Sequence, residues 1–367
     1  MSKKPRLWPS VEPGTVPLVD NHTHLPVVSR EIPRDSHRVA LPLTEQLARA
    51  ATAGVRAVIT SVCDLDDVRR ADRLLARWQD SRTSAMPPLS AHEDLREDRG
   101  VVARSGLEDE AAAYQALAQV DNTPDLQVGT TWSGSYDGAL PRVYFAAGIH
   151  PNEAAIHGGY RDRSPDGLTP TVKDFHAATI DDAVGEVAAL VAKYPTDVVA
   201  IGETGLDYYR TGQGGREAQI AGFRAQIQLA KELDLPLQIH DRQAHADVVS
   251  TLLADGAPER TIFHCFSGDR ELAEICNTHR WYASIAGPIS YPRNVELRDA
   301  VTHIDQALLL LETDAPYLTP TPWRGRPNAS YLIGHTLQAL AELRLVSAQK
   351  LADQIYATTC EMYALIA

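Results

Sequence analysis

His22 and His24 stand two residues apart in the stretch V-D-N-H-T-H, which continues an apolar run. Side chains on a β-strand alternate between its two faces, so residues two apart project to the same side. A strand over residues 17–24 would therefore place Asp20, His22 and His24 on one face. Two imidazoles that converge on one point suit a divalent metal ion. The alternative is a surface turn in which the H-x-H pattern arises by chance.

Histidines and acids also stand at the ends of most other apolar runs. They are His150 in G-I-H-P, Glu203 in A-I-G-E-T-G-L-D-Y-Y, His240 in L-Q-I-H, His264 in F-H-C-F-S-G and Asp314 in L-E-T-D-A-P-Y-L. When parallel strands close into a barrel, their carboxyl ends form the face that carries the active site. Chance explains such a series of strand ends poorly, so the set indicates a site more strongly than any single member does.

Imidazole nitrogens and carboxylate oxygens together form a ligand set for two divalent ions. Glu203 is the candidate carboxylate that bridges the two ions, and Asp314 is the candidate acceptor of a proton from attacking water. The alternative roles are a buried structural acid for Glu203 and a helix N-cap for Asp314. Magnesium, manganese, zinc and iron all accept such ligands, so the ligand types do not select the metal. We expect six residues to bind metal: His22, His24, Glu203, His240, His264 and Asp314.

Three further residues near these ends are candidates for substrate contacts. Arg242 lies two residues after His240 and either contacts a phosphate or forms a salt bridge on the surface. Tyr208 either stacks on a base, since aromatic rings bind single strands without recognising their sequence, or packs at the rim of the site. Arg324 either holds a phosphate through two guanidinium nitrogens or belongs to a solvated loop.

Eight β-rich apolar runs, separated by helical patterns, supply these strand ends. We expect strands at Pro17–His24, Ala57–Val62, Val143–His150, Val198–Gly205, Pro236–His240, Thr261–Phe266, Trp281–Gly287 and Leu308–Asp314. Strands that alternate with helices indicate a parallel sheet, and eight such units indicate an α/β fold of the (β/α)8 TIM-barrel type, distorted by insertions. A doubly wound open sheet is the alternative.

Apolar residues at helical spacing predict four helices, over residues 44–53, 181–194, 217–233 and 347–365. Thr44 is the expected cap of the first helix, and Gly54 is expected to end it. Cys265 follows His264 in a predicted strand, so its side chain should point away from the barrel interior and pack.

One segment interrupts the alternation of strands and helices. Residues 81–142 are long for a connection, and we interpret them as an insertion after the second strand, with a helical pattern over Glu108–Val120. A second irregular stretch covers His157–Thr171. No internal repeat divides the chain, so we expect residues 1–367 to form a single domain.

The composition excludes some classes of protein. The 35 basic and 48 acidic residues give a net charge of −13, which argues against a protein that coats nucleic acid through a broad basic surface. It does not exclude an enzyme that takes a phosphodiester into a pocket charged by metal ions. The four cysteines form no C-x-x-C pair, and no apolar run is long enough to span a bilayer. We expect a cytoplasmic protein with free thiols, no membrane association and no obligate protein partner.

The motifs D-N-H-T-H, G-I-H-P, I-G-E-T-G-L-D-Y-Y, L-P-L-Q-I-H, H-C-F-S-G and E-T-D-A-P-Y-L, in this order, resemble those of the TatD family of metal-dependent deoxyribonucleases. The resemblance covers the chain from Leu18 to the C-terminus, apart from the insertions. It implies a divalent-metal phosphodiesterase on a TIM-type barrel, often a 3′-to-5′ exonuclease on single-stranded DNA. It also assigns metal binding to the six residues above and makes His150 a substrate-side candidate.

The chain departs from the family pattern after Asp314. An Arg-Asn dipeptide followed by proline is usual there, whereas this chain has W-R-G-R-P-N-A-S, in which Arg324, Arg326 and Asn328 are possible substitutes. This departure concerns the choice of substrate more than the chemistry. Two alternatives stay open: hydrolysis of a lactone, amide, phosphotriester or aminoacyl-tRNA ester at the same site, and a scaffold without enzymatic activity.

Overall fold

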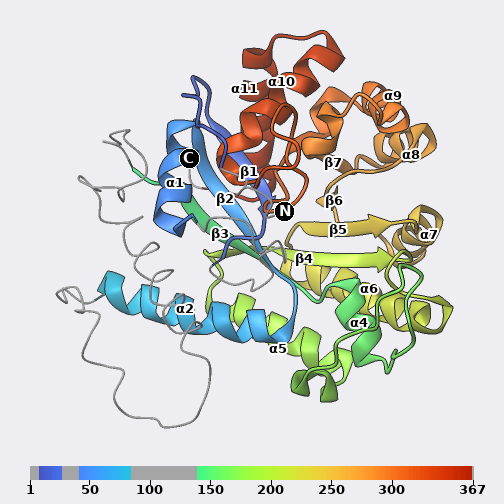
Figure 1. The fold of residues 1–367 in the computed structure, drawn as a ribbon. Coiled ribbons are helices and arrows are strands. Elements are labelled where there is room, and N and C mark those ends of the chain that lie inside the picture. The colour runs from blue at the N-terminus through green and yellow to red at the C-terminus, as the bar shows by residue number, and fades with distance from the viewer. Residues whose placement is uncertain (1–7, 27–40, 84–138, 366–367) are drawn as a thin grey trace, which may run out of the picture.

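Eight parallel strands form one sheet in the order in which they occur along the chain (Figure 1). The computed structural model describes residues 8–26, 41–83 and 139–365. The strands are β1 (Leu18–Thr23), β2 (Val55–Val62), β3 (Arg142–Ala147), β4 (Val198–Asp207), β5 (Leu237–Arg242), β6 (Thr261–Phe263), β7 (Tyr282–Ile285) and β8 (Leu309–Leu311). Every expected strand is present, and the predicted barrel-type α/β fold is confirmed.

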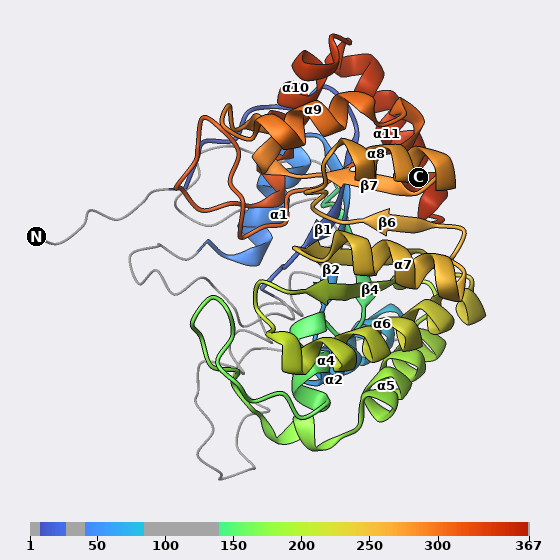
Figure 2. The ribbon, with the colours of Figure 1, turned by 90° about the vertical axis from the view of Figure 1, so that its right-hand side faces the viewer.

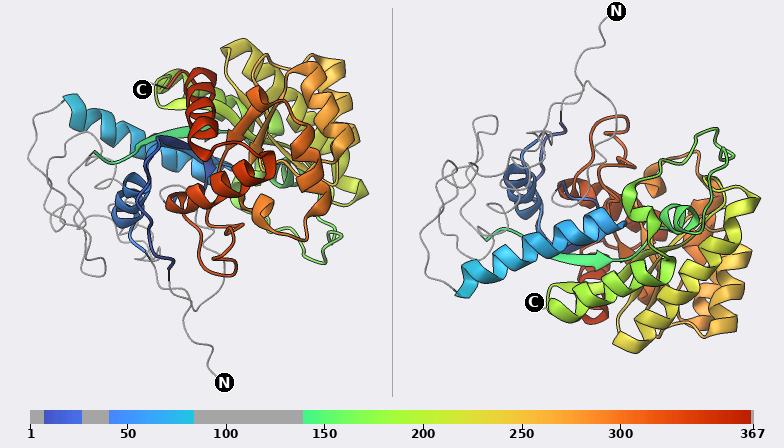
Figure 3. Two further views of the ribbon diagram at one scale, coloured as in Figure 1. Left: turned by 90° about the horizontal axis from the view of Figure 1, so that it is seen from above. Right: turned by 90° about the horizontal axis from the view of Figure 1, so that it is seen from below.

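Helices connect successive strands and cover the outside of the sheet. Figure 2 shows α7, α8 and α9 following one another around it, and Figure 3 shows α2 lying along α5. The helices are α1 (Leu43–Thr52), α2 (Leu65–Thr83), α4 (Pro151–His157), α5 (Ile180–Lys193), α6 (Gln213–Leu233), α7 (His245–Asp255), α8 (Arg270–His279), α9 (Val295–His303), α10 (Ile333–Arg344) and α11 (Ala348–Met362). Four short 3-10 helices lie at Asp174–Ala177, Gly287–Ser290, Gln306–Leu308 and Ser330–Leu332.

All four predicted helices form, but the predicted cap of the first one is wrong. Helix α1 begins one residue before Thr44, and its N-cap is Pro42, whose side chain accepts no hydrogen bond. The fixed φ of proline sets the entry of the chain, so Thr44 already lies inside the first turn. Gly54 follows the helix with φ +89°, a conformation that favours glycine, as expected for a residue that ends it.

The insertion after the second strand lies largely outside the described residues. Helix α2 extends to Thr83 and β3 begins at Arg142, so only the two ends of the predicted segment are described, and the pattern over Glu108–Val120 is not. The second irregular stretch is confirmed, because the chain between α4 and the 3-10 helix at Asp174–Ala177 contains no helix or strand. The single domain over residues 1–367 stays a prediction.

Side chains rather than a strand ladder complete the contact between β1 and β8. Asp20 accepts hydrogen bonds from the backbone N–H of Thr313 at 2.8 Å and from its hydroxyl at 2.6 Å. Asn21 donates to the carbonyl of Leu311 at 2.6 Å. Two backbone bonds extend this contact past the strands, from the N–H of Asp314 to His22 and from the N–H of His24 to Ala315. The last strand thus meets the first, which favours a barrel over an open sheet.

Two apolar clusters stabilise the barrel. The larger lies between the sheet and the surrounding helices, and the smaller fills the interior near the amino ends of the strands. Met362, Tyr363 and Leu365 pack into this interior cluster, so the end of the chain closes the barrel opposite the carboxyl ends of the strands. Among the described residues, no helix has both the length and the apolarity needed to cross a membrane.

Candidate metal centre

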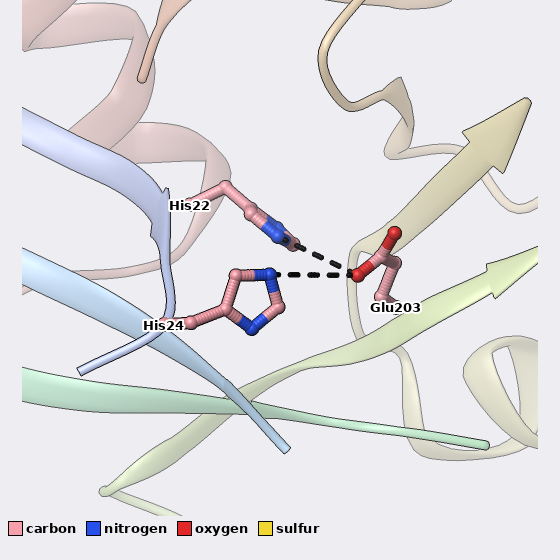
Figure 4. Close-up of side chains that lie close together, drawn as sticks. All are labelled: His22, His24 and Glu203. Carbon is pink, nitrogen blue, oxygen red and sulfur yellow. Dashed lines mark ion pairs between the residues drawn. The ribbon is translucent and has the colours of Figure 1, made fainter. Parts of the chain in front are cut away.

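The structure brings together all six predicted metal ligands, with Glu203 of β4 at their centre. His22 belongs to β1, His24 follows it, His240 belongs to β5, and His264 directly follows β6. Asp314 lies three residues beyond the end of β8. Figure 4 shows the imidazoles of His22 and His24 converging on one carboxylate oxygen of Glu203.

One oxygen of Glu203 faces the β1 histidines. Its Oε2 lies 3.7 Å from Nε2 of His22 and 3.8 Å from Nε2 of His24. Asp314 joins this group, with Oδ1 at 3.4 Å from Nε2 of His24 and 3.9 Å from Nε2 of His22. Only the contact between Asp314 and His24 is within hydrogen-bond distance, and the other three distances are too long for hydrogen bonds. The four side chains nevertheless surround a common point, as the donors of a metal site do.

The other oxygen of Glu203 faces three further histidines. Its Oε1 lies 2.6 Å from Nδ1 of His240, 3.1 Å from Nε2 of His264 and 3.5 Å from Nε2 of His150. His150, predicted on the substrate side, therefore lies against the central carboxylate. Cys63, which no sequence argument singled out, places its Sγ 3.7 Å from Oε2 of the same carboxylate.

The glycines of the G-E-T-G motif let β4 approach β5 closely. A Cβ on Gly205 would lie 2.1 Å from the carbonyl oxygen of His240, and one on Gly202 would lie 2.7 Å from that of Gln238. Both glycines also have positive φ, +130° and +146°. The motif therefore holds the carboxylate of Glu203 within reach of His240.

Three of the histidines face Glu203 with one ring nitrogen and form a hydrogen bond to another side chain with the second ring nitrogen. Nδ1 of His22 lies 3.0 Å from Oε1 of Gln238, and Nδ1 of His264 lies 3.1 Å from Oε1 of Glu312. Nε2 of His240 lies 3.2 Å from Oδ2 of Asp207. An acceptor at one ring nitrogen keeps the proton there and leaves the lone pair of the other nitrogen for a metal ion.

Sequence reasoning missed these three acceptors, although a signal was present. Asp207 lies four residues after Glu203, Gln238 two before His240, and Glu312 two before Asp314. Even spacing along a strand places side chains on one side of the sheet. For Asp207 in β4 and Gln238 in β5, the rule that selected the candidate ligands could therefore have selected their partners as well. Glu312 lies beyond the end of β8, so the rule does not extend to it.

His150 differs from these three histidines in the direction of its hydrogen bond. It is the N-cap of α4, and its Nδ1 accepts from the backbone N–H of Asn152 at 3.1 Å. Burial lowers the pKa of His150 to about 4, so the ring is neutral near pH 7. A neutral ring that accepts at Nδ1 carries its proton on Nε2, the atom that faces Glu203. His150 thus presents a donor to the site.

Burial and neighbouring groups shift the pKa values of the central residues in different directions. Burial alone would raise the pKa of Glu203, but His264 and His150 beside it hold the pKa well below its usual range. Burial opposes charge on His240 as well, yet its bonds to Asp207 and Glu203 raise its pKa to about 9. His22 has the opposite balance, because burial lowers its pKa to about 3.

The residues present fit a divalent metal ion. Nε2 of His22 is fully buried and forms no hydrogen bond within the described part of the chain. Such an atom is costly unless something binds it. Three sets of side chains place their ligand atoms within 4.8 Å of one another: His22, His24 and Glu203; His22, His264 and Asp314; and His150, Glu203 and His240.

Apart from His150, the predicted substrate residues lie in two different environments. Tyr208 is buried, with its hydroxyl 2.6 Å from Asp247 and the guanidinium of Arg216 over its ring, so the structure does not bring it to the centre. Arg242 and Arg324 are exposed and stack on tyrosines, Arg242 at 3.9 Å from the ring centroid of Tyr209 and Arg324 at 4.4 Å from that of Tyr291.

The structure also corrects the prediction for Cys265. Cys265 is not in a strand, because β6 ends at Phe263; its φ of +43° and its N–H bond to Glu312 turn it toward the acids of the centre. The pKa of its thiol is raised by burial and by Asp314 beside it.

Asn328, a possible substitute for the usual residues after Asp314, is buried and donates to the carbonyls of Thr313 and Tyr317. Its side chain therefore fixes the segment that follows β8.

Known proteins are similar to this chain in sequence and in fold. The sequence model of the family described as "TatD related DNase" matches residues 19–364. The "Uncharacterized metal-dependent hydrolase TatD" of Mycobacterium tuberculosis is 40% identical over 243 residues, which are 65% of this chain and 82% of that protein. The metal-dependent hydrolase YabD of Bacillus subtilis is also 40% identical, over 42% of this chain and 61% of that protein.

A relative with a named activity and a solved structure extend the comparison. The "3'-5' ssDNA/RNA exonuclease TatD" of Pantoea vagans is 36% identical over 51% of this chain and 74% of that protein. The crystal structure of YJJV, a TatD homologue from Escherichia coli, has a TM-score of 0.64 at 22% identity and covers 95% of this chain and 98% of that one. This structural likeness supports the fold.

Proposed function

The chain belongs to the family of TatD-related DNases, and on this premise we propose that it hydrolyses phosphodiester bonds of nucleic acid at the centre around Glu203. The observation that carries the proposal is one buried carboxylate between two groups of histidines, one group facing Oε2 and the other facing Oε1. A carboxylate arranged in this way could hold one divalent ion on each side.

Two divalent ions, of magnesium, manganese or zinc, would bind on either side of Glu203. Bound ions would lower the pKa of an attacking water molecule and offset negative charge on the scissile phosphate. The six predicted residues would hold them: His22, His24 and Asp314 on the side of Oε2, His240 and His264 on the side of Oε1, and Glu203 between them.

Asp314 and His150 would handle protons during the reaction. Burial alone would raise the pKa of Asp314, but its bond to His24 and the nearby His264 lower it, so the carboxylate is ionised and can accept a proton from water. The Nε2–H of His150 would donate to an oxygen of the phosphate, since its Nδ1 is already an acceptor.

The substrate we propose is single-stranded DNA, attacked from its 3′ end. The exonuclease name of the Pantoea vagans relative supports this choice. So do the two exposed arginines that stack on tyrosines, because guanidinium groups bind phosphate and also stack on bases. Tyr209, which is partly exposed, is a better candidate for stacking than the buried Tyr208.

The decisive experiment digests 3′-labelled and 5′-labelled single-stranded oligonucleotides with magnesium, manganese or zinc. The Glu203→Ala variant is tested beside the wild type, with Glu186→Ala as a control that removes a carboxylate from an exposed ion pair with Arg69. We expect metal-dependent shortening from the 3′ end that is lost only in Glu203→Ala. A Glu203→Ala protein with the wild-type rate would refute the bridging role.

Absence of cleavage would test the proposed substrate and not the metal centre. If the folded, metal-loaded protein cleaves neither oligonucleotide, the choice of nucleic acid is wrong. A panel of lactones, amides, phosphotriesters and aminoacyl-tRNA esters at the same metal concentrations would then identify the bond.

A further inference from the structure

We propose that Tyr363, at the end of the chain, is a positioning residue that fixes the metal-binding nitrogen of His22 by acting through Gln238. The proposal rests on the proposed metal centre. Tyr363 lies just after α11, on the side of the barrel opposite the site, and is buried with 2% of its surface exposed. Its hydroxyl reaches into the barrel, where two side chains separate it from the central carboxylate.

A continuous hydrogen-bonded chain joins Tyr363 to His22. The hydroxyl of Tyr363 lies 2.8 Å from Nε2 of Gln238, and Oε1 of Gln238 lies 3.0 Å from Nδ1 of His22. The same hydroxyl lies 3.2 Å from Oδ1 of Asn21. Gln238 also donates to the backbone carbonyl of Asn21 at 2.7 Å. All four side chains are buried, so no competing solvent contact is available to them.

Backbone carbonyls fix the direction of every bond in this chain. Asn21 donates from Nδ2 to the carbonyl of Leu311, so its Oδ1 is an acceptor and the Tyr363 hydroxyl must donate to it. The Tyr363 oxygen then accepts from Gln238, whose amide nitrogen also donates to a carbonyl. A carbonyl cannot donate, so the amide of Gln238 cannot reverse without losing these bonds.

The fixed direction determines which nitrogen of His22 is free. Because Oε1 of Gln238 can only accept, Nδ1 of His22 carries the proton. Nε2 is then left with a lone pair, and this is the buried atom that forms no hydrogen bond within the described residues. Without the Tyr363 hydroxyl, one bond that holds the Gln238 amide is gone, and the imidazole can rotate or exchange its tautomer more easily.

The arrangement links the C-terminal segment to the metal centre. Met362 and Leu365 seat Tyr363 in the apolar interior of the barrel, so the position of the hydroxyl depends on how the end of α11 packs. Partners of metal-binding histidines typically change metal affinity by about 10- to 100-fold when they are removed. Tyr363 lies one step further away, so we expect a smaller effect, of roughly 3- to 10-fold.

The test measures zinc dissociation constants by competition with a chromogenic chelator for the wild type, for Glu203→Ala and for four further variants of the full chain. Tyr363→Phe removes only the hydroxyl. Tyr356→Phe is the matched control, because Tyr356 is a partly buried tyrosine of α11 whose hydroxyl contacts Cys360 instead of Gln238. Gln238→Met and the double variant Gln238→Met/Tyr363→Phe complete a cycle. We expect weaker zinc binding in Tyr363→Phe, no change in Tyr356→Phe, and no further loss from Tyr363→Phe once Gln238 is replaced.

Each outcome bears on a different claim. If the wild type and Glu203→Ala bind zinc equally, the metal centre itself is refuted. If the wild type binds zinc and Tyr363→Phe binds it equally well, or the two losses multiply in the double variant, only the role of Tyr363 is refuted. Should a variant fail to fold, ¹⁵N-histidine NMR of the metal-free wild type still decides: a proton on Nδ1 of His22 supports the proposal, and one on Nε2 overturns it.

Discussion

Glu203 presents its two oxygens to different histidines, and this separates the candidate centre from an ordinary buried acid. A structural acid needs one or two donors to satisfy it. Here Oε1 lies within 3.5 Å of three imidazoles, while Oε2 faces two more at distances too long for hydrogen bonds. The carboxylate therefore organises the centre, and the rings around it differ in which nitrogen is free.

Replacement of His150 tests whether this residue donates a hydrogen bond to the substrate or binds a metal ion. His150→Asn retains a side-chain oxygen that can cap α4, but it loses the Nε2–H donor. We expect unchanged zinc stoichiometry and a kcat lowered by about 10- to 100-fold, because a donor to the phosphate acts in the reaction rather than in metal binding. Elemental analysis and single-turnover kinetics measure the two effects. Loss of a metal ion in His150→Asn would make His150 a ligand.

The protons at the centre predict how metal affinity depends on pH. In the metal-free protein, bonds to Asp207 and Glu203 outweigh burial and raise the pKa of His240 to about 9, so a metal ion must displace its proton. As pH falls below 9, the protonated form dominates and the apparent affinity decreases. We expect at least about tenfold weaker manganese binding for each pH unit between 8 and 6. A dissociation constant independent of pH would contradict this, and so would the absence of proton release in calorimetry.

The candidate ligands were predictable from the sequence, whereas their hydrogen-bonding partners were harder to find. His22, His240 and Asp314 stand where buried apolar runs end, and such runs define strands well. Asp207 and Glu312 look like ordinary acids in the sequence. Spacing can give the side of the sheet for Asp207, but only the folded arrangement shows which histidine each acid meets. Asp207 meets His240 of the adjacent β5, and Glu312, which follows β8, meets His264 across β7.

At the scale of elements, the ends of the strands position the chemistry. The prediction for Cys265 failed because β6 ends at Phe263, three residues before the predicted end of the strand at Phe266. Both Cys265 and Asp314 have positive φ, +43° and +49°, so the chain turns sharply there and alternation no longer tells where a side chain points. Local backbone conformation of this kind depends on tertiary bonds, such as that between Cys265 and Glu312.

The close approach of β4 and β5 can be tested with one methyl group. In Gly205→Ala the new Cβ would meet the carbonyl of His240 at 2.1 Å, so the strands must separate and Glu203 must move. We expect a loss of about 1–3 kcal/mol in the free energy of unfolding, measured with urea, and weaker zinc binding. Gly185→Ala, in α5, is the matched control, because nothing lies within 4 Å of its Cβ. We expect that control to be neutral or stabilised by about 0.5–1 kcal/mol.

At the scale of the whole molecule, the net charge of −13 limits how the protein can hold nucleic acid. A long basic groove would release many counterions when DNA binds, and affinity would then fall steeply with salt. The described structure instead offers two exposed arginines, Arg242 and Arg324, each stacked on a tyrosine. Contacts with few phosphates fit the proposed substrate, whose 3′ end would reach the proposed metal centre.

The dependence of binding on salt measures the number of these contacts. Each phosphate neutralised on a single strand contributes about −0.7 to the slope of log K against log salt. We expect a slope of about −1 to −2 for a labelled oligonucleotide bound to Glu203→Ala, a background chosen because it should not cleave. Arg242→Ala and Arg324→Ala should each reduce the slope by about 0.7, since each would remove one phosphate contact. Arg270→Ala, which breaks an exposed pair with Asp299, should leave the slope unchanged. A slope steeper than about −4 that neither arginine affects would place the binding surface elsewhere and refute the proposed phosphate contacts of these two arginines.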